Sequence, residues 1–443
     1  MSTLLTFRRT VCVTTLCVCN IIDEIGIYHH TVIYANTVRI SDGKIQWGVN
    51  EEGIAFYNNL IDECLRNGLE PFVTLFHWDT PQALQDRYGG FLSPSIVDDF
   101  RDYAELCFER FGDRVKYWIT LSEPCTYAVW GHDYGEHAPG RCSSWKNRAC
   151  KAGNSAVEPY IVAHHQLLSH AAAVDVYRKK YKGQQKGLVG TTLLTWWTEP
   201  YSSKTADIDA AKRVLDFMYG WFLDPLTYGD YPRTMREYVK NRLPMFTQTQ
   251  SEMLRGSLDF LGLNYYSSRY VKNVESQDPE RISYTSDLHA DLRYENSEGQ
   301  SIAPAAGVEW LRIAPFGIRY LLNYTKDNYK NPPIFITENG VASDDSEPYC
   351  DIINDKIRIE YYESHIGNVS KAIKEHNVSV KGFLAWSSTD TFEWSSGYTV
   401  RFGLTYIDFY RKNLTRIPKS SLEWLKGKLL GDSASQNCPA SSA

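Results

Sequence analysis

The stretch VNEEGIAFYNNLIDECLRNGLEPFVTLFHWD, residues 49–79, holds one full repeat of the pattern that decides the fold. Residues 49–67 place apolar side chains on one face at helical spacing, and Gly68 then interrupts the period. Residues 70–77 are predicted to form a buried strand, and the polar residues His77, Trp78 and Asp79 stand where it ends. A helix followed by a buried strand indicates a parallel sheet, because parallel strands need crossover connections.

The same alternation continues along the chain. Further strands are predicted at 115–121, 187–197, 257–265, 333–337 and 380–387, with helices at 94–111, 158–181, 206–223, 316–328, 355–376 and 420–428. Six strands are clear, whereas a closed barrel has eight. We therefore predict an α/β fold, a (β/α)8 TIM barrel whose first strand and helix are missing or replaced. Residues 31–34 are the one further strand candidate. An open doubly wound sheet is the alternative, but no glycine-rich phosphate loop follows any strand.

Composition excludes several classes of function. A net charge of −6 leaves no basic excess for a nucleic-acid partner. The apolar stretch 11–22 has signal-peptide proportions and is too short and polar for a membrane span. His164 and His165 lie inside a predicted helix, where their side chains point about 100° apart. The pair His29-His30 has no acidic or thiol partner at ligand spacing, so we expect no metal and no cofactor.

Cysteines and sequons bear on the cellular compartment. Cys142 and Cys150 bracket a polar loop that a local disulfide would close in an oxidising compartment, the alternative being two free thiols. N-glycosylation sequons, which fit a secretory protein, occur at Asn323, Asn368, Asn377 and Asn413. We divide the chain into a divergent segment 1–38 (a signal peptide or a mis-spliced region), a barrel domain 39–430 and a disordered tail 431–443. The longest insertion, 271–313, is polar and without periodicity.

Polar residues cluster where five of the predicted strands end. The clusters are His77-Trp78-Asp79, Ser122-Glu123, Asn264-Tyr265-Tyr266, Glu338-Asn339, and Trp386 with Glu393-Trp394. In a barrel these ends converge on one face, the usual active site. One carboxylate after a strand is more often a helix cap or a solvated loop residue, but five clusters favour a shared site. Two carboxylates on that face suit glycoside hydrolysis, with aromatic side chains as sugar platforms.

Five motifs, taken in order, resemble those of plant β-glucosidases of glycoside hydrolase family 1 over residues 39–425. They are TLFHWD at 74–79, TLSEP at 120–124, GLNYYS at 262–267, ITENG at 336–340 and FEWSSGYTVRFGL at 392–404. The Cys142–Cys150 loop also resembles plant members, in which it is disulfide-bonded. The resemblance implies a retaining enzyme that takes small-molecule β-glucosides and passes through the secretory pathway. Oligomeric state, including a homo-oligomer, stays open, as does the aglycone.

The resemblance also implies a role for each residue. Glu338 would be the nucleophile and Glu123 the acid/base, with the carboxyl groups about 5 Å apart. Tyr266 would hydrogen-bond the nucleophile, and Trp386 would stack beneath the sugar ring. The remaining sugar contacts would be His77, Ser122, Asn264, Glu393 and Trp394.

Three departures from the family pattern support a second hypothesis, a catalytically impaired relative. Ser122 replaces the Asn that precedes the acid/base Glu in the family; a lesser difference, outside these three, is Thr391 in place of an Asn in the last motif. Before Arg39 we find no counterpart of the family's first strand with its sugar-binding Gln. The Arg of its second strand is likewise not found in residues 25–40. A truncated gene, an alternative transcript or a wrong exon assignment would account for the two N-terminal losses, but not for Ser122.

Overall fold

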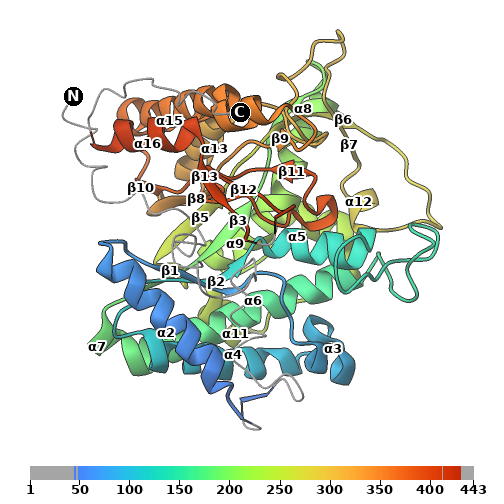
Figure 1. Ribbon diagram of the computed structural model, residues 1–443. Coiled ribbons are helices and arrows are strands. Elements are labelled where there is room, and N and C mark those ends of the chain that lie inside the picture. Colours follow the sequence, from blue (N-terminus) through green and yellow to red (C-terminus); the bar gives the residue numbers. More distant parts are fainter. Residues whose placement is uncertain (1–43, 46–47, 412, 431–443) are drawn as a thin grey trace.

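A parallel sheet of six strands forms the centre of the protein (Figure 1). The computed structural model describes residues 44–45, 48–411 and 413–430. In sheet order the strands are β1 (Phe72–Phe76), β2 (Tyr117–Ser122), β3 (Leu188–Leu194), β5 (Phe260–Asn264), β8 (Ile334–Glu338) and β10 (Val380–Phe383). Every neighbouring pair is parallel. Each strand overlaps one of the six predicted ranges, so that prediction is confirmed.

Helices cover the outside of this sheet. The main ones are α2 (Glu51–Arg66), α4 (Ser95–Phe111), α6 (Glu158–Val176), α8 (Thr205–Leu215), α9 (Trp221–Tyr228), α13 (Pro315–Asn328), α15 (Lys356–His376) and α16 (Ser420–Leu430). Figure 1 shows α13, α15 and α16 on one side of the strands and α2, α4 and α6 on the other. In α2 the buried residues Ile54, Tyr57, Ile61 and Cys64 recur at helical spacing, which turns one apolar stripe toward the core.

Aromatic rings at the beginnings of the strands show that the sheet is curled. Phe72 of β1 and Phe335 of β8 have ring centroids 5.1 Å apart, although three strands lie between them in the sheet. Tyr117 and Phe260, from β2 and β5, pack against the same rings. Side chains of non-adjacent strands meet only inside a closed curve, so these rings fill the barrel interior at its amino-terminal end. Polar side chains stand at the opposite, carboxyl end of the strands.

The insertion 271–313 is more ordered than predicted. There β6 (Ser268–Asn273) pairs in parallel with β4 (Trp197–Pro200) and antiparallel with β7 (Ala290–Arg293). The predicted strand 187–197 therefore ends early, and its last residue begins β4. The alternation in β6 and β7 is too short and too polar to stand out as a periodic pattern.

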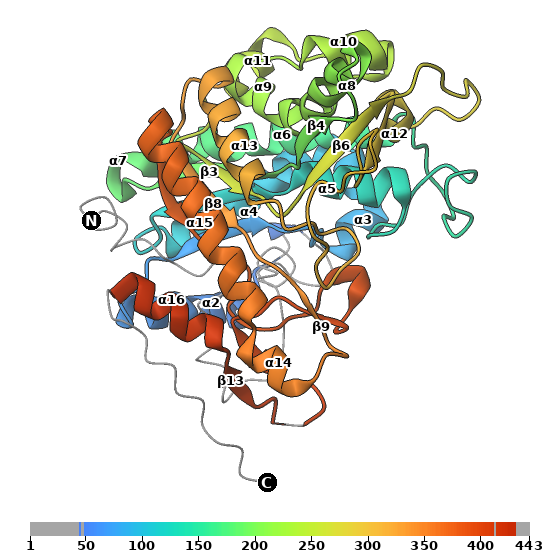
Figure 2. The same cartoon turned by 90° about the horizontal axis from the view of Figure 1, so that it is seen from above.

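Shorter elements decorate the barrel (Figure 2). The helices are α3 (Gln82–Tyr88), α5 (Pro124–Val129), α7 (Lys182–Gln185), α10 (Arg233–Val239), α11 (Gln248–Leu254), α12 (Tyr284–Asp287) and α14 (Tyr349–Asn354). The strand pairs are β9 (Ser343–Asp344) with β11 (Val400–Arg401), and β12 (Thr405–Ile407) with β13 (Arg416–Pro418). The predictions for segment 1–38, including the strand candidate 31–34, and for the tail 431–443 lie outside the described residues. None of the helices in the described ranges has the length and apolar character needed to span a bilayer.

Candidate active site

Glu123 and Glu338, the two predicted catalytic residues, lie at the carboxyl end of the sheet and are linked through Asn264. Glu123 directly follows β2, Glu338 ends β8, and Asn264 ends β5 between them. Asn264 Nδ2 donates to Glu123 Oε1 over 2.7 Å, while the Asn264 Cα is paired with that of Glu338. The charge of Glu123 also acts on Glu338, raising its pKa. The barrel thus brings together two side chains that are 215 residues apart in the sequence, at positions 123 and 338.

Glu123 is buried and held at both carboxylate oxygens. The backbone of Glu123 is in the left-handed region, with φ at 47°. Its N–H donates to the Thr192 carbonyl over 2.9 Å. Thr126 Oγ1 donates to Oε2 over 3.1 Å, opposite the bond from Asn264. Burial raises the pKa of Glu123 to about 7, and the two hydrogen bonds limit that rise. A carboxyl group with this pKa exchanges a proton readily near neutral pH.

Glu338 shares Asn264 with Glu123 and has Tyr266 as a partner of its own. The Tyr266 hydroxyl donates to Glu338 Oε2 over 2.7 Å. Burial raises the pKa of Glu338 well above its usual range, and the charge of Glu123 raises it further. The side chains of Tyr266 and Asn264 oppose both effects because their hydrogen bonds stabilise the charged carboxylate. Among the described residues, no Lys or Arg forms an ion pair with Glu338.

Four aromatic side chains form one cluster beside the glutamates. The ring of His77 lies 6.5 Å from that of Trp386 and 5.6 Å from that of Trp394. Trp78 packs on Trp394 with centroids 4.1 Å apart and donates its indole N–H to the Ser122 carbonyl over 3.0 Å. Trp78 and Trp394 both have positive φ, at 72° and 50°. Strained backbone of this kind concentrates at functional sites, where the surrounding structure maintains it.

Glu393 is a third buried carboxyl group at the same face. Burial raises its pKa to about 8, while hydrogen bonds from Thr391 and Trp386 partly offset the rise. Thr391, which replaces the family's Asn, donates to Glu393 Oε1 over 3.0 Å. The loop before it is anchored by Asp390, which is fully buried and accepts from Arg401 and Lys419 over 2.8 Å each. This anchor fixes the loop that carries Trp386, Glu393 and Trp394.

Ser122 lies at the end of β2 and is only 3% exposed. Its carbonyl binds Trp78 and its Cα pairs with Thr192. The predicted catalytic and sugar-binding residues from His77 to Trp386 lie within three residues of the carboxyl end of a strand, whereas Glu393 and Trp394 lie on the longer loop that follows β10. Whether each touches a sugar remains a prediction.

Trp310 is a candidate that sequence analysis missed. It lies within the insertion, is 39% exposed, and meets the ring of Tyr266 edge-on with centroids 5.7 Å apart. Its carbonyl accepts from the buried guanidinium of Arg269, which fixes this part of the insertion next to Tyr266. The only available signal was an isolated Trp in a segment without periodicity.

The predicted disulfide is present between Cys142 and Cys150. Its loop is fastened to the insertion by Lys146, whose ammonium pairs with Asp133 over 3.1 Å and contacts Thr285. The four sequons differ in exposure. Asn377 and Asn413 are exposed, whereas Asn323 and Asn368 are half-buried within helices.

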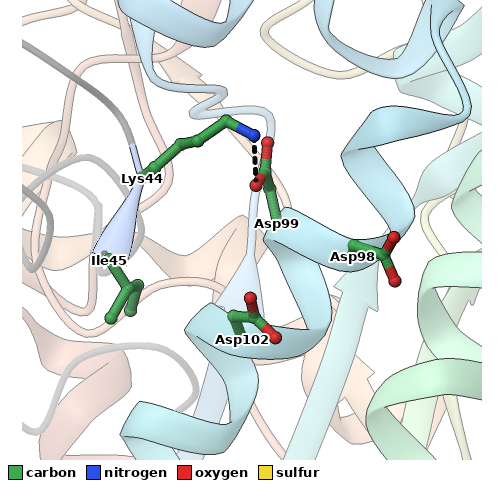
Figure 3. A pocket seen from close by; sticks show the side chains of 5 residues that line it. All are labelled: Lys44, Ile45, Asp98, Asp99 and Asp102. Atoms are coloured by element: carbon green, nitrogen blue, oxygen red, sulfur yellow. Dashed lines mark ion pairs between the residues drawn. The ribbon is translucent and has the colours of Figure 1, made fainter. Parts of the chain in front are cut away.

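A separate hollow of about 200 Å³ lies beside α4 (Figure 3). It is lined by Lys44, Ile45, Asp98, Asp99 and Asp102. Lys44 pairs with Asp99 over 2.9 Å, so the one cation present is already neutralised. None of these residues belongs to the candidate site. In the ranges that the structure describes, no three His, Cys, Asp or Glu side chains gather in a way that could hold a metal ion.

The sequence profile described as Glycosyl hydrolase family 1 matches residues 20–429. The chain belongs to glycosyl hydrolase family 1. This match begins at residue 20, whereas the resemblance based on the motifs begins only at Arg39. Beta-glucosidase 24 of Oryza sativa subsp. japonica is 53% identical over 392 residues, covering 88% of this chain and 77% of that protein. Furcatin hydrolase of Viburnum furcatum is 50% identical over 411 residues, covering 93% and 75%.

Solved structures agree with the family assignment. The crystal structure of a rice β-glucosidase superposes with a TM-score of 0.86 at 45% identity, covering 89% of this chain and 82% of that one. A β-glucosidase from the fungus Humicola insolens, solved in complex with glucose, gives a TM-score of 0.83 at 37% identity, covering 87% and 80%. The fold is the (β/α)8 barrel of this family, and the described residues supply six of its strands.

Proposed function

We propose that this family 1 protein is a retaining β-glucosidase that hydrolyses O-β-D-glucosides through a covalent glycosyl-enzyme. Glu338 attacks the anomeric carbon, and Glu123 protonates the departing glycosidic oxygen. Glu123 then removes a proton from the water that releases the sugar. The observation that carries the proposal is the pair of buried glutamates that share Asn264, with Thr126 as a further donor to Glu123 and Tyr266 as a further donor to Glu338.

The donors around each carboxyl group support this division of roles. A nucleophile must be charged, and the Tyr266 hydroxyl stabilises that charge on Glu338. An acid/base must hold and release a proton, and a pKa of about 7 places Glu123 in that range. Because both groups are buried, a proton remains on the pair near neutral pH.

The polar and aromatic residues around the glutamates would bind the sugar. His77, Glu393 and Trp394 would contact hydroxyl groups, and Trp386 would stack against the ring. Ser122 and Asn264 would complete the contacts beside Glu123. Trp310, partly exposed and packed on Tyr266, lies where it could meet the aglycone. Passage through the secretory pathway belongs to the same proposal, supported by the disulfide and the two exposed sequons.

A chromogenic β-glucoside assay on the purified chain tests this function. We expect turnover by the unaltered protein and loss of at least about a thousandfold in Glu338→Gln. A 2-deoxy-2-fluoro glucoside should label the unaltered protein, and mass spectrometry should find the sugar on the peptide that contains Glu338. Equal background rates for both proteins would reject the enzyme and leave a non-catalytic relative.

A further inference from the structure

Three buried side chains form a directed chain of hydrogen bonds that ends on Glu123. Thr192 Oγ1 donates to Thr337 Oγ1 over 3.2 Å, and Thr337 Oγ1 donates to Asn264 Oδ1 over 2.7 Å. Asn264 Nδ2 then donates to Glu123 Oε1 over 2.7 Å. The exposed fractions of Thr192, Thr337 and Asn264 are 2%, 1% and 0%, so bulk water does not compete for these bonds.

The register of the strands brings these side chains together. Between β5 and β8 the pairing passes from Leu263↔Ile336 directly to Asn264↔Glu338, which leaves Thr337 as an extra residue. An extra residue re-aims the side chains around it, and here it precedes Glu338. Gly262 provides the space, because a Cβ there would lie 2.2 Å from Thr192 Oγ1 and 3.0 Å from Thr337 Cγ2. The hydroxyl pair therefore depends on a glycine at this position.

The number of hydrogens sets the direction of the chain. A hydroxyl carries a single hydrogen, and that of Thr337 goes to Asn264 because Thr192 already donates to Thr337. The end of the Asn264 amide that faces Thr337 must then be the oxygen, so its NH2 faces Glu123. In the opposite orientation, an amide N–H would face the Thr337 hydroxyl, which already receives the Thr192 hydrogen, and the Thr337 hydrogen would lose Asn264 Oδ1 as its acceptor.

We propose that Thr337 is a positioning residue for the acid/base, holding the Asn264 amide with its NH2 group directed at Glu123. This inference rests on the proposed role of Glu123. Thr337 touches no substrate in the proposed reaction and acts only through Asn264. The motif ITENG at 336–340 thus supplies both the nucleophile and, one residue earlier, the hydroxyl that orients a partner of the acid.

Loss of the Thr337 hydroxyl should therefore change the protonation of Glu123. The Asn264 N–H stabilises the charged carboxylate and lowers its pKa. Without Thr337 to fix it, the amide can turn its oxygen toward Glu123, which favours the protonated form. One charge-assisted hydrogen bond corresponds to an upward pKa shift of about one unit. A misdirected acid should also lower kcat/KM more for glucosides with poor leaving groups, which need protonation, than for glucosides with good leaving groups.

The test compares Thr337→Val, which removes the hydroxyl at constant shape, with Thr337→Ser, which keeps it. Infrared titration of the protonated carboxyl band, assigned by its loss in Glu123→Gln, follows Glu123 directly and needs no turnover. The pH profile of kcat/KM is measured in parallel on a nitrophenyl and an alkyl β-glucoside. Thr192→Val, which removes only the first donor of the chain, should give a smaller shift in the same direction.

We expect Thr337→Val to raise the Glu123 midpoint by about one pH unit and Thr337→Ser to leave it unchanged. The loss of kcat/KM in Thr337→Val should be at least about tenfold greater on the alkyl glucoside than on the nitrophenyl glucoside. An unmoved midpoint, with equal losses on both substrates, overturns the inference. If Thr337→Val does not fold, the Thr192→Val midpoint decides by the same criterion. A wild-type protein without turnover would reject the proposed function alone, because the infrared midpoints still test the inference.

Discussion

Replacement of Tyr266 by Phe should move the acidic limb of the pH profile. Tyr266 is 5% exposed, and its hydroxyl donates to Glu338 Oε2 over 2.7 Å. Phe keeps the ring that packs on Trp310 and Phe402 and removes only this donor. The hydrogen bond favours the charged carboxylate, so its loss raises the pKa of Glu338. Since the nucleophile must be ionised, the acidic limb of the pH profile, along which activity falls as the pH is lowered, should shift to higher pH.

The size of the shift follows from the strength of one hydrogen bond to a charged group. Such a bond contributes about 1.5–3 kcal/mol, and one pKa unit corresponds to about 1.4 kcal/mol. The acidic limb of kcat/KM should therefore rise by about 1–2 pH units. The profile of kcat/KM is the correct observable because it reports the ionisation of the free enzyme.

The neighbouring tyrosine provides a matched control. Tyr265 is fully buried, and its hydroxyl contacts Ser268 and the Ala314 carbonyl rather than a glutamate. Tyr265→Phe should lower the melting temperature without moving the acidic limb. If Tyr266→Phe left the limb in place, or if both variants moved it equally, the hydroxyl of Tyr266 would not be what stabilises the charge on Glu338.

Three further predictions concern stability and modification. Burial raises the pKa of Glu393 to about 8, so between pH about 4.5 and 8 the folded state keeps a proton that the unfolded chain has lost, and stability falls as pH rises. Glu393→Gln should thus gain melting temperature over wild type at pH 8 and little at pH 5; equal gains would refute this. Reduction of the Cys142–Cys150 disulfide, whose ends are 8 residues apart, should cost about 2.5 kcal/mol in chemical unfolding, and an unchanged midpoint would contradict it. In a secretory host, Asn377→Gln should remove one glycan mass because Asn377 is exposed, whereas Asn368→Gln should remove none, because the Asn368 side chain binds the Ser364 carbonyl.

The six strands could be predicted because strands buried on both faces are largely apolar runs, as FVTLF at residues 72–76 illustrates. The two glutamates could be located because Glu123 directly follows such a strand and Glu338 is the last residue of another. Both signals are local in the sequence. They depend on no contact with a distant residue.

Features that depend on distant contacts could not be predicted in this way. The extra residue at Thr337 arises from the register between two strands, and nothing in the motif ITENG indicates it. The contact of Lys146 with Thr285 joins the disulfide loop to α12, 139 residues further along the chain. Trp310 is held by Arg269, whose buried guanidinium donates to the Trp310 carbonyl and lies over the ring of Trp196. Composition carries no information on these pairings.

Among the departures from the family pattern, Ser122 most directly concerns how the site contacts the 2-hydroxyl of the sugar. The resemblance implies that an Asn at this position contacts the sugar 2-hydroxyl, a contact that strengthens in the transition state. The shorter Ser side chain, 3% exposed at the end of β2, reaches less far. Ser122→Asn should therefore raise kcat/KM on a nitrophenyl β-glucoside by about a hundred- to a thousandfold, the scale of one oriented donor in a catalytic site. The matching 2-deoxyglucoside, which lacks that hydroxyl, should show no gain. A gain on both substrates would assign the effect to packing, and a loss on both would mean that β2 has no room for the longer side chain.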